Sequence, residues 1–175
     1  GGIVRRTEHL AEATREGRLV VKICGITSPA DARVAVEAGA DALGFVFWFM
    51  SPRKVDPVRA AAIARDLPES VLRVGVFVDA PLDDMKRVAD QVGLDLLQLH
   101  GDEPPEALVS LPRPALKAVR VGKGFAADIL PGLTTEVAAA MALPPAGAYN
   151  HLVRRIQEAA RNEFDTDAVR PVLII

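Results

Sequence analysis

Short apolar runs rich in β-branched residues alternate with amphipathic segments along most of the chain. The apolar runs are bounded by turn-forming residues, as strands are, and the segments between them carry apolar residues at helical spacing. Residues 20–24 are the first clear strand, and Gly25 followed by Ser28 and Pro29 marks a turn into a helix. Further strands are predicted at 41–47, 71–78, 94–101, 115–121 and 169–175. Helices are predicted at 3–18, 29–38, 57–66, 81–92, 103–111, 134–143 and 151–164.

Four or five strand-helix units of roughly 25 residues follow one another, and their strands are almost continuously apolar, which predicts parallel strands covered on both faces. A (β/α) barrel and an open doubly wound sheet both fit this order. Polar residues decide between them, because they follow the ends of several strands, as in barrel enzymes, whereas an open sheet gathers its site at one switch point. These residues are Cys24, Arg53, Asp79, Gln98 and His100. We therefore predict an α/β parallel barrel of TIM type, formed by one domain over residues 1–175.

Composition narrows the class of protein further. The chain has 175 residues, a formal net charge of −2 and one cysteine, so neither a nucleic-acid footprint nor an intrachain disulfide is expected. The longest apolar run, residues 42–50, is too short to span a bilayer, and the polar start lacks the apolar core of a signal peptide. We expect no membrane partner and a cytoplasmic location.

Cys24 is the leading candidate for chemistry. It ends a strand where the N–H groups of a glycine turn and of a helix start can favour a thiolate, which can act as a base or nucleophile. The alternative is a small buried apolar residue. Arg53 and His100 also have structural alternatives, as a solvated loop cation and as a hydrogen-bonded histidine at a strand end.

Several motifs between residues 21 and 130 together resemble the phosphoribosylanthranilate isomerases of tryptophan biosynthesis. They are Lys-Ile-Cys-Gly-Ile-Thr at 22–27, Ala-Gly-Ala-Asp-Ala-Leu-Gly-Phe-Val-Phe at 38–47, Ser-Pro-Arg at 51–53, Val-Gly-Val-Phe-Val at 74–78, Gln-Leu-His-Gly-Asp-Glu at 98–103 and Leu-Lys-Ala-Val-Arg at 116–120.

The resemblance implies a (β/α)8 barrel that needs no cofactor or metal and binds a small phosphorylated anthranilate substrate. It implies an Amadori rearrangement of N-(5-phosphoribosyl)anthranilate to 1-(o-carboxyphenylamino)-1-deoxyribulose 5-phosphate. By the same resemblance, Cys24 is the general base that removes the C2′ proton, Arg53 holds the anthranilate carboxylate, and Gln98 and His100 line the pocket. A tuned thiolate and a guanidinium suit these roles.

The family pattern covers about 20–131 and is lost over 132–175, so the barrel is expected to be incomplete or rearranged after its fifth strand. The family's general-acid aspartate and its glycine-rich phosphate loops are not found there, and Asp128, Asp165 and Asp167 stand outside its motifs. An alternative is therefore a noncatalytic truncated, chimeric or engineered fragment that self-associates through an exposed sheet edge. A homodimer is thus a possible assembly. A flavodoxin-like binding domain is a third, weaker reading. We also expect the last strand and first helix to be neighbours, unless Gly1-Gly2 is a cloning remnant.

Overall fold

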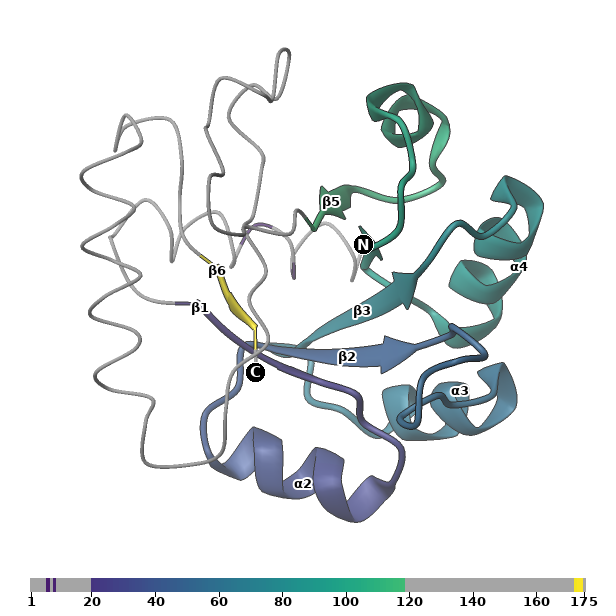
Figure 1. The fold of residues 1–175 in the computed structure, drawn as a ribbon. Coiled ribbons are helices and arrows are strands. Elements are labelled where there is room, and N and C mark those ends of the chain that lie inside the picture. Colours follow the sequence, from purple (N-terminus) through teal and green to yellow (C-terminus); the bar gives the residue numbers. More distant parts are fainter. Residues whose placement is uncertain (1–5, 7, 9–19, 119–171, 175) are drawn as a thin grey trace, which may run out of the picture.

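The computed structural model describes residues 6, 8, 20–118 and 172–174, and these residues contain a parallel sheet with helices packed against it (Figure 1). The strands are β1 (Val20–Cys24), β2 (Ala42–Val46), β3 (Leu72–Phe77), β4 (Leu96–Leu99), β5 (Ala115–Lys117) and β6 (Val172–Ile174). The helices are α2 (Pro29–Glu37), α3 (Pro57–Arg65), α4 (Leu82–Val92) and the 3₁₀ helix η1 (Pro105–Ser110).

The sheet has the strand order β5-β4-β3-β2-β1-β6, and every pairing in it is parallel. From β1 to β5 each strand lies beside its successor in the chain. β6 instead returns to β1, with Val20 opposite Val172 and Lys22 opposite Ile174. The predicted parallel strand-helix architecture is therefore confirmed, and β1 lies inside the sheet with a partner on each side.

The helices begin where the sequence supplies caps. The Ser28 side chain accepts a hydrogen bond from the N–H of Asp31 at the start of α2, and Asp56 accepts one from Arg59 at the start of α3. A proline follows each cap at a position where a helix needs no N–H donor. Helix α4 ends at Gly93, which adopts the left-handed conformation that glycine tolerates best.

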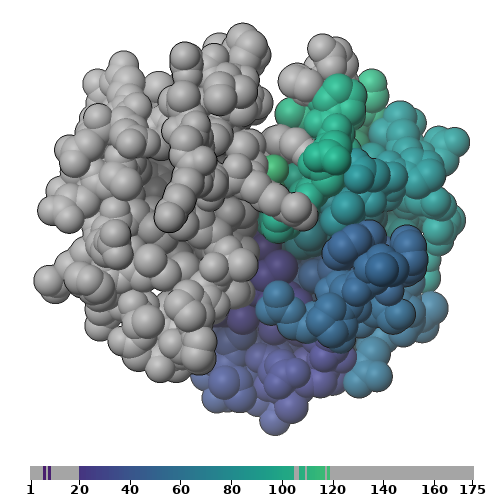
Figure 2. Space-filling model, in the orientation of Figure 1, coloured from purple at the N-terminus to yellow at the C-terminus, as the bar shows by residue number. Residues whose placement is uncertain are grey.

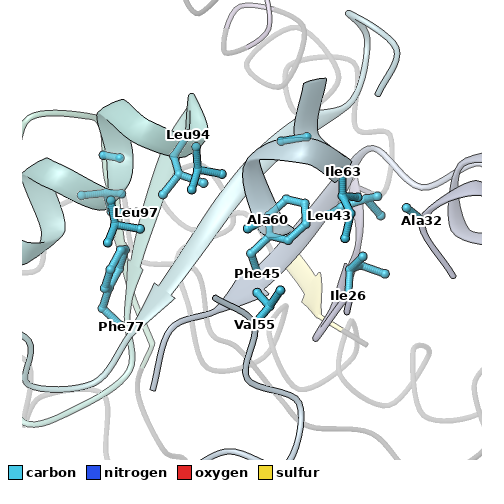
Figure 3. Close-up of a cluster of buried hydrophobic side chains, with 14 of the residues drawn as sticks. Ile26, Ala32, Leu43, Phe45, Val55, Ala60, Ile63, Phe77, Leu94 and Leu97 are labelled. Carbon is cyan, nitrogen blue, oxygen red and sulfur yellow. The ribbon is translucent and has the colours of Figure 1, made fainter. Parts of the chain in front are cut away.

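The two faces of the sheet bury different side chains. Successive residues of a strand point to opposite faces, so Leu43, Phe45, Phe77 and Leu97 pack outward against the helices (Figure 3). In the space-filling view α2 lies at the lower edge of the coloured part of the molecule and α4 at its right-hand edge (Figure 2). A second, smaller cluster lies on the inner face, where a barrel has its interior; its members are Ala42, Leu72, Val74 and Leu96.

Two strands are entered through the same Gly-apolar-Asp sequence. Gly39 and Gly93 have φ angles of 89° and 73°, and the aspartate two residues later accepts a hydrogen bond from the neighbouring strand. Asp41 accepts from the N–H of Val21, and Asp95 accepts from that of Arg73, both at 2.8 Å. These carboxylates fix each new strand in register at the amino-terminal edge of the sheet.

Some predicted boundaries differ from the structure. The strand expected at 94–101 is only Leu96–Leu99, because Asp95 serves as the cross-strand acceptor and the chain turns after His100. The short helix expected at 103–111 is the 3₁₀ helix η1, and the strand expected at 115–121 is described as far as Lys117.

Parts of the prediction fall beyond the described residues. The predicted helices 134–143 and 151–164 lie outside them, as do Gly1 and Ile175, whose proximity we expected. Of the predicted helix 3–18, residues 6 and 8 are described and are helical. Among the described residues, none of the helices combines the length and the apolar character needed to cross a membrane.

Candidate active site

The inner face of the sheet carries polar side chains as well as the small apolar cluster. Alternation along β1 places Lys22 and Cys24 on the same side of the strand, and Cys24 lies opposite Gly44 of β2. A Cβ atom at Gly44 would lie 2.9 Å from Cys24 Sγ and 3.0 Å from Lys22 Nζ. A side chain at this position would crowd both groups, so glycine here leaves the space that they occupy.

Cys24 is the last residue of β1 and is half-buried. Gly25 follows it with a φ of 86° and turns the chain away from the sheet. The N–H groups of Gly25 and Ile26 both donate to the carbonyl oxygen of Gly44, at 2.9 and 3.0 Å. These two N–H groups of the turn therefore donate to the neighbouring strand and not to the Cys24 sulfur.

Arg53 lies beside the end of β1, although it belongs to the loop between β2 and α3. Its Nη1 donates to the carbonyl oxygen of Cys24 at 3.2 Å, while its own N–H donates to the Ser51 hydroxyl. The side chain runs across Gly25, where a Cβ atom would lie 2.8 Å from Arg53 Cδ. The glycine of the Cys-Gly turn therefore lets an exposed guanidinium approach the candidate base.

Gln98 and His100 form a second pair at the end of β4. Gln98 is only 1% exposed, and its Nε2 lies 3.4 Å from Nδ1 of the half-buried His100. Gln98 Oε1 is buried and has no hydrogen-bond partner in the described part of the chain. Strands β2 and β3 separate this pair from Cys24 in the sheet. Cys24, Arg53 and His100 lie at or beyond the carboxyl ends of strands, and Gln98 is the last residue but one of β4.

The loops that follow β3 and β4 are tied together next to His100. Glu103 accepts hydrogen bonds from the N–H groups of Asp79 and Gly101, at 2.8 and 2.9 Å, and Asp79 accepts one from Asp102 at 2.8 Å. Asp79 has a φ of 49°, a backbone conformation that costs free energy for residues other than glycine. The carboxylate of Asp79 packs where a Cβ atom of Gly101 would stand, so the two loops fit only with glycine there.

Sequence reasoning missed Lys22 as a residue of this site. It is 1% exposed, and burial lowers the pKa of its ammonium group. The signal was present in the sequence, since Lys22 is the one charged residue in an otherwise apolar strand. Within the described ranges, no group of three or more His, Cys, Asp or Glu side chains could hold a metal ion.

Comparisons with known proteins agree on one family. The family model for N-(5'-phosphoribosyl)anthranilate isomerase matches residues 21–135. A curated isomerase of that name from Geotalea daltonii is 57% identical over 101 residues, which are 58% of this chain and 49% of that relative. The chain thus spans about half the length of the curated relatives that it matches.

Solved structures extend the likeness. The phosphoribosyl anthranilate isomerase of Thermotoga maritima superposes with a TM-score of 0.68 and 31% identity, covering 89% of this chain and 86% of that one. A second such isomerase was solved in complex with reduced 1-(o-carboxyphenylamino)-1-deoxyribulose 5-phosphate. It superposes with a TM-score of 0.64 and 34% identity over 89% of this chain and 85% of its own. The strand-helix units therefore follow the TIM-barrel arrangement of these structures.

Proposed function

Because the chain belongs to the N-(5'-phosphoribosyl)anthranilate isomerase family, we propose that it catalyses the rearrangement for which that family is named. The substrate is N-(5-phosphoribosyl)anthranilate and the product is 1-(o-carboxyphenylamino)-1-deoxyribulose 5-phosphate. A related isomerase has been solved with a reduced form of this product, which supports the same substrate class here. The reaction moves a proton from C2′ of the opened sugar, so it needs a base next to a bound anthranilate group.

The observation that carries the proposal is the placement of Cys24 and Arg53 side by side. Cys24 supplies a half-buried sulfur at the carboxyl edge of the sheet, and the Arg53 guanidinium lies within hydrogen-bond distance of the Cys24 carbonyl oxygen. A guanidinium binds a planar carboxylate through paired hydrogen bonds, so Arg53 can hold the anthranilate while Cys24 takes the C2′ proton.

Other residues complete the environment of the reaction. Trp48, Phe49 and Met50 are exposed in the same loop as Arg53 and offer apolar surface to an aromatic ring. We place Gln98 and His100 in the pocket wall, where their amide and imidazole groups can contact the sugar. The general acid that the rearrangement also requires is not assigned to a described residue.

Turnover of freshly prepared phosphoribosylanthranilate, followed by its fluorescence, tests this function. The unchanged chain should convert the substrate, and Cys24→Ala should lose conversion by at least about a hundredfold, since general base catalysis contributes on this order. Stability should stay nearly constant, because a half-buried thiol is a small part of the core. No turnover in the unchanged chain would refute the proposal and favour a noncatalytic barrel fragment.

We also propose a homodimer in the cytoplasm. A solved structure that is 33% identical to the chain holds mutually generated monomers of the Thermotoga maritima isomerase, and it describes that isomerase as dimeric. A reduced thiol is required of a cysteine base, and the cytoplasm keeps thiols reduced. Sedimentation velocity at micromolar concentration distinguishes a dimer from a monomer and from the open-ended assemblies that an exposed strand edge would give.

A further inference from the structure

Lys22 combines burial, the lack of an oxygen or nitrogen partner, and proximity to the candidate base. Its side chain is 1% exposed, Nζ contacts no oxygen or nitrogen acceptor within the described part of the chain, and the group that stabilises its charge is the Cys24 sulfur. Nζ and Cys24 Sγ both pack against Gly44. A Cβ atom on residue 44 would lie 3.0 Å from Nζ and 2.9 Å from Sγ. The amine is thus buried beneath the sulfur, on the same inner face of β1.

Such a lysine is costly unless an anion balances it. An unpaired buried ammonium loses its hydration without compensation, and methionine or leucine would fill the same space without that loss. Burial lowers the pKa of Lys22 most strongly, the negative charge of Cys24 opposes that effect, and the positive charge of Arg53 adds to it. Among the described groups acting on Lys22, the Cys24 sulfur is the one that favours a charged amine.

We propose that Lys22 is a positioning residue that takes the proton of the Cys24 thiol and keeps the sulfur as a thiolate. The step moves one proton from sulfur to nitrogen, giving Cys24–S⁻ and Lys22–NH₃⁺ from Cys24–SH and Lys22–NH₂. The net charge of the Cys24–Lys22 pair is therefore zero before and after the transfer. This inference rests on the proposed function, in which Cys24 is the base.

The position of Lys22 suits a residue that acts through another. It lies two residues before Cys24 and is fully buried, while Cys24 is half-buried at the strand end. Cys24 is in part exposed, which allows a substrate to reach it at the carboxyl edge of the sheet, while Lys22 lies further back along β1. Gly44 provides the common space, because any larger residue there would push the sulfur and the amine away from their present positions.

Alkylation of the thiol tests the pair without any need for turnover. The chain has one cysteine, so iodoacetamide reports on Cys24 alone. Thiolates react and thiols do not, and a neighbouring cation favours the thiolate. At about pH 7, Lys22→Met should react at least about tenfold more slowly than the unchanged chain, and at about pH 10 the two rates should converge. Lys86→Met, which changes an exposed lysine of α4, should react like the unchanged chain at both pH values.

Two further measurements keep the outcomes separate. Lys22→Gln removes the charge but keeps a polar group, and it should slow alkylation at least about tenfold, as expected for Lys22→Met. It provides the test if Lys22→Met fails to fold. A structural lysine would predict equal alkylation rates at neutral pH in all folded variants, and that result overturns the inference. Lysine-dependent alkylation in a chain without isomerase turnover would instead support the pair and refute the proposed function.

Discussion

Gly44 shows how the absence of one side chain shapes the candidate site. It stands in the interior of β2, where glycine weakens a strand, yet its missing Cβ leaves room for Lys22 Nζ and Cys24 Sγ. We predict that Gly44→Ala lowers turnover by at least about tenfold, because a small displacement of a base reduces catalysis strongly. Turnover and iodoacetamide alkylation measure the effect.

Gly75→Ala is the matched control for this substitution. Gly75 lies on the neighbouring strand β3, but its missing Cβ faces the side chains of Leu94 and Phe77 on the outer face of the sheet. Both variants should lose about 1–3 kcal/mol of stability through overpacking. Only Gly44→Ala should change the reactivity of Cys24, and equal effects from the two variants would contradict the prediction.

Arg53 is the residue whose role can be separated from catalysis by kinetics. If it holds the anthranilate carboxylate, Arg53→Gln removes a charged hydrogen-bond donor worth about 1.5–3 kcal/mol, and KM should rise roughly ten- to a hundredfold. The expected fall in kcat is smaller. Steady-state kinetics measure both, with Arg59→Gln, an exposed change on α3, as the control. An unchanged KM would leave Arg53 as a solvated loop residue.

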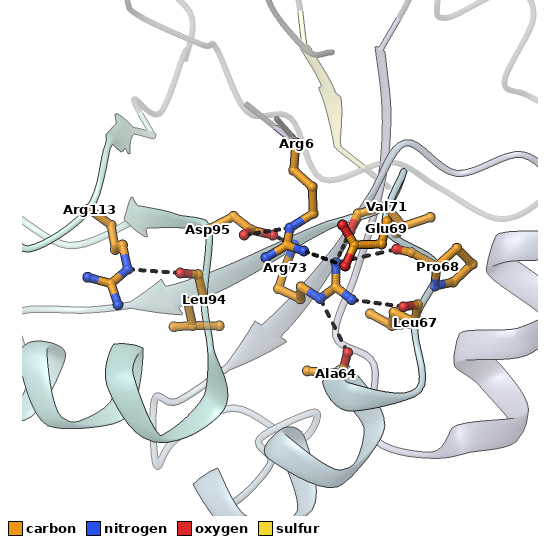
Figure 4. A network of polar contacts seen from close by, with 10 residues as sticks. All are labelled: Arg6, Ala64, Leu67, Pro68, Glu69, Val71, Arg73, Leu94, Asp95 and Arg113. Atoms are coloured by element: carbon orange, nitrogen blue, oxygen red, sulfur yellow. Dashed lines mark hydrogen bonds and ion pairs between the residues drawn. The ribbon is translucent and has the colours of Figure 1, made fainter. Parts of the chain in front are cut away.

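At the scale of elements, the amino-terminal edge of the sheet is held by buried charge. Asp95 has no exposed surface and accepts hydrogen bonds from Arg6 Nε and from the Arg73 N–H, both at 2.8 Å (Figure 4). Arg73 in turn donates to carbonyl oxygens in the last turn of α3 and just beyond it, among them those of Ala64 and Leu67. Burial lowers the pKa of Arg73 most, and the charge of Arg6 lowers it further, while Asp95 opposes both. This network connects β4, β3 and the end of α3.

Removing the carboxylate of Asp95 should therefore destabilise the fold. Asp95→Ala removes the nearer carboxylate partner of Arg6 and leaves the buried Arg73 N–H without its acceptor, and we expect a loss of about 3–5 kcal/mol in the free energy of unfolding. Asp41→Ala removes a comparable acceptor, the one for Val21 N–H, and should cost about 1–3 kcal/mol. Urea denaturation measures both losses. Asp66→Ala, which breaks an exposed pair with Arg65, should change stability by less than about 1 kcal/mol.

The elements could be predicted from the sequence because local signals agree with the fold. Caps at Ser28 and Asp56 and apolar β-branched runs mark where helices and strands begin. The exact strand ends could not be predicted, since they depend on cross-strand acceptors such as Asp95 that only the assembled sheet brings into position.

Only part of the candidate site could be predicted from the sequence. The types and strand-end positions of Cys24 and Arg53 were visible in the sequence, but the hydrogen bond between the Arg53 guanidinium and the Cys24 carbonyl was not. Lys22 was missed because a lysine in a strand is usually interpreted as a solvent-exposed residue. Its burial becomes apparent only when β2 presents Gly44 to it.

At the scale of the molecule, β6 is the second strand that pairs with β1. A chain ending at residue 171 would lack this strand and would expose an edge of β1. We expect it to form larger species than the full chain in sedimentation velocity experiments, because unpaired parallel edges recruit other copies. Leu173→Ile, which keeps the backbone donor and a strand-favouring side chain, should behave like the full chain. A truncated chain of unchanged size would contradict this prediction.

The pairing of Val20 with Val172 also determines when the site can form during synthesis. Strands β1 to β5 pair with near neighbours in sequence and can associate as they leave the ribosome, from the amino terminus onward. One side of β1 must wait until residues 172–174 have been made. The strand that carries Lys22 and Cys24 is thus fully paired only after β6 has been synthesised, so the surroundings of the candidate base are completed by the pairing that joins the most distant strands of the described sheet.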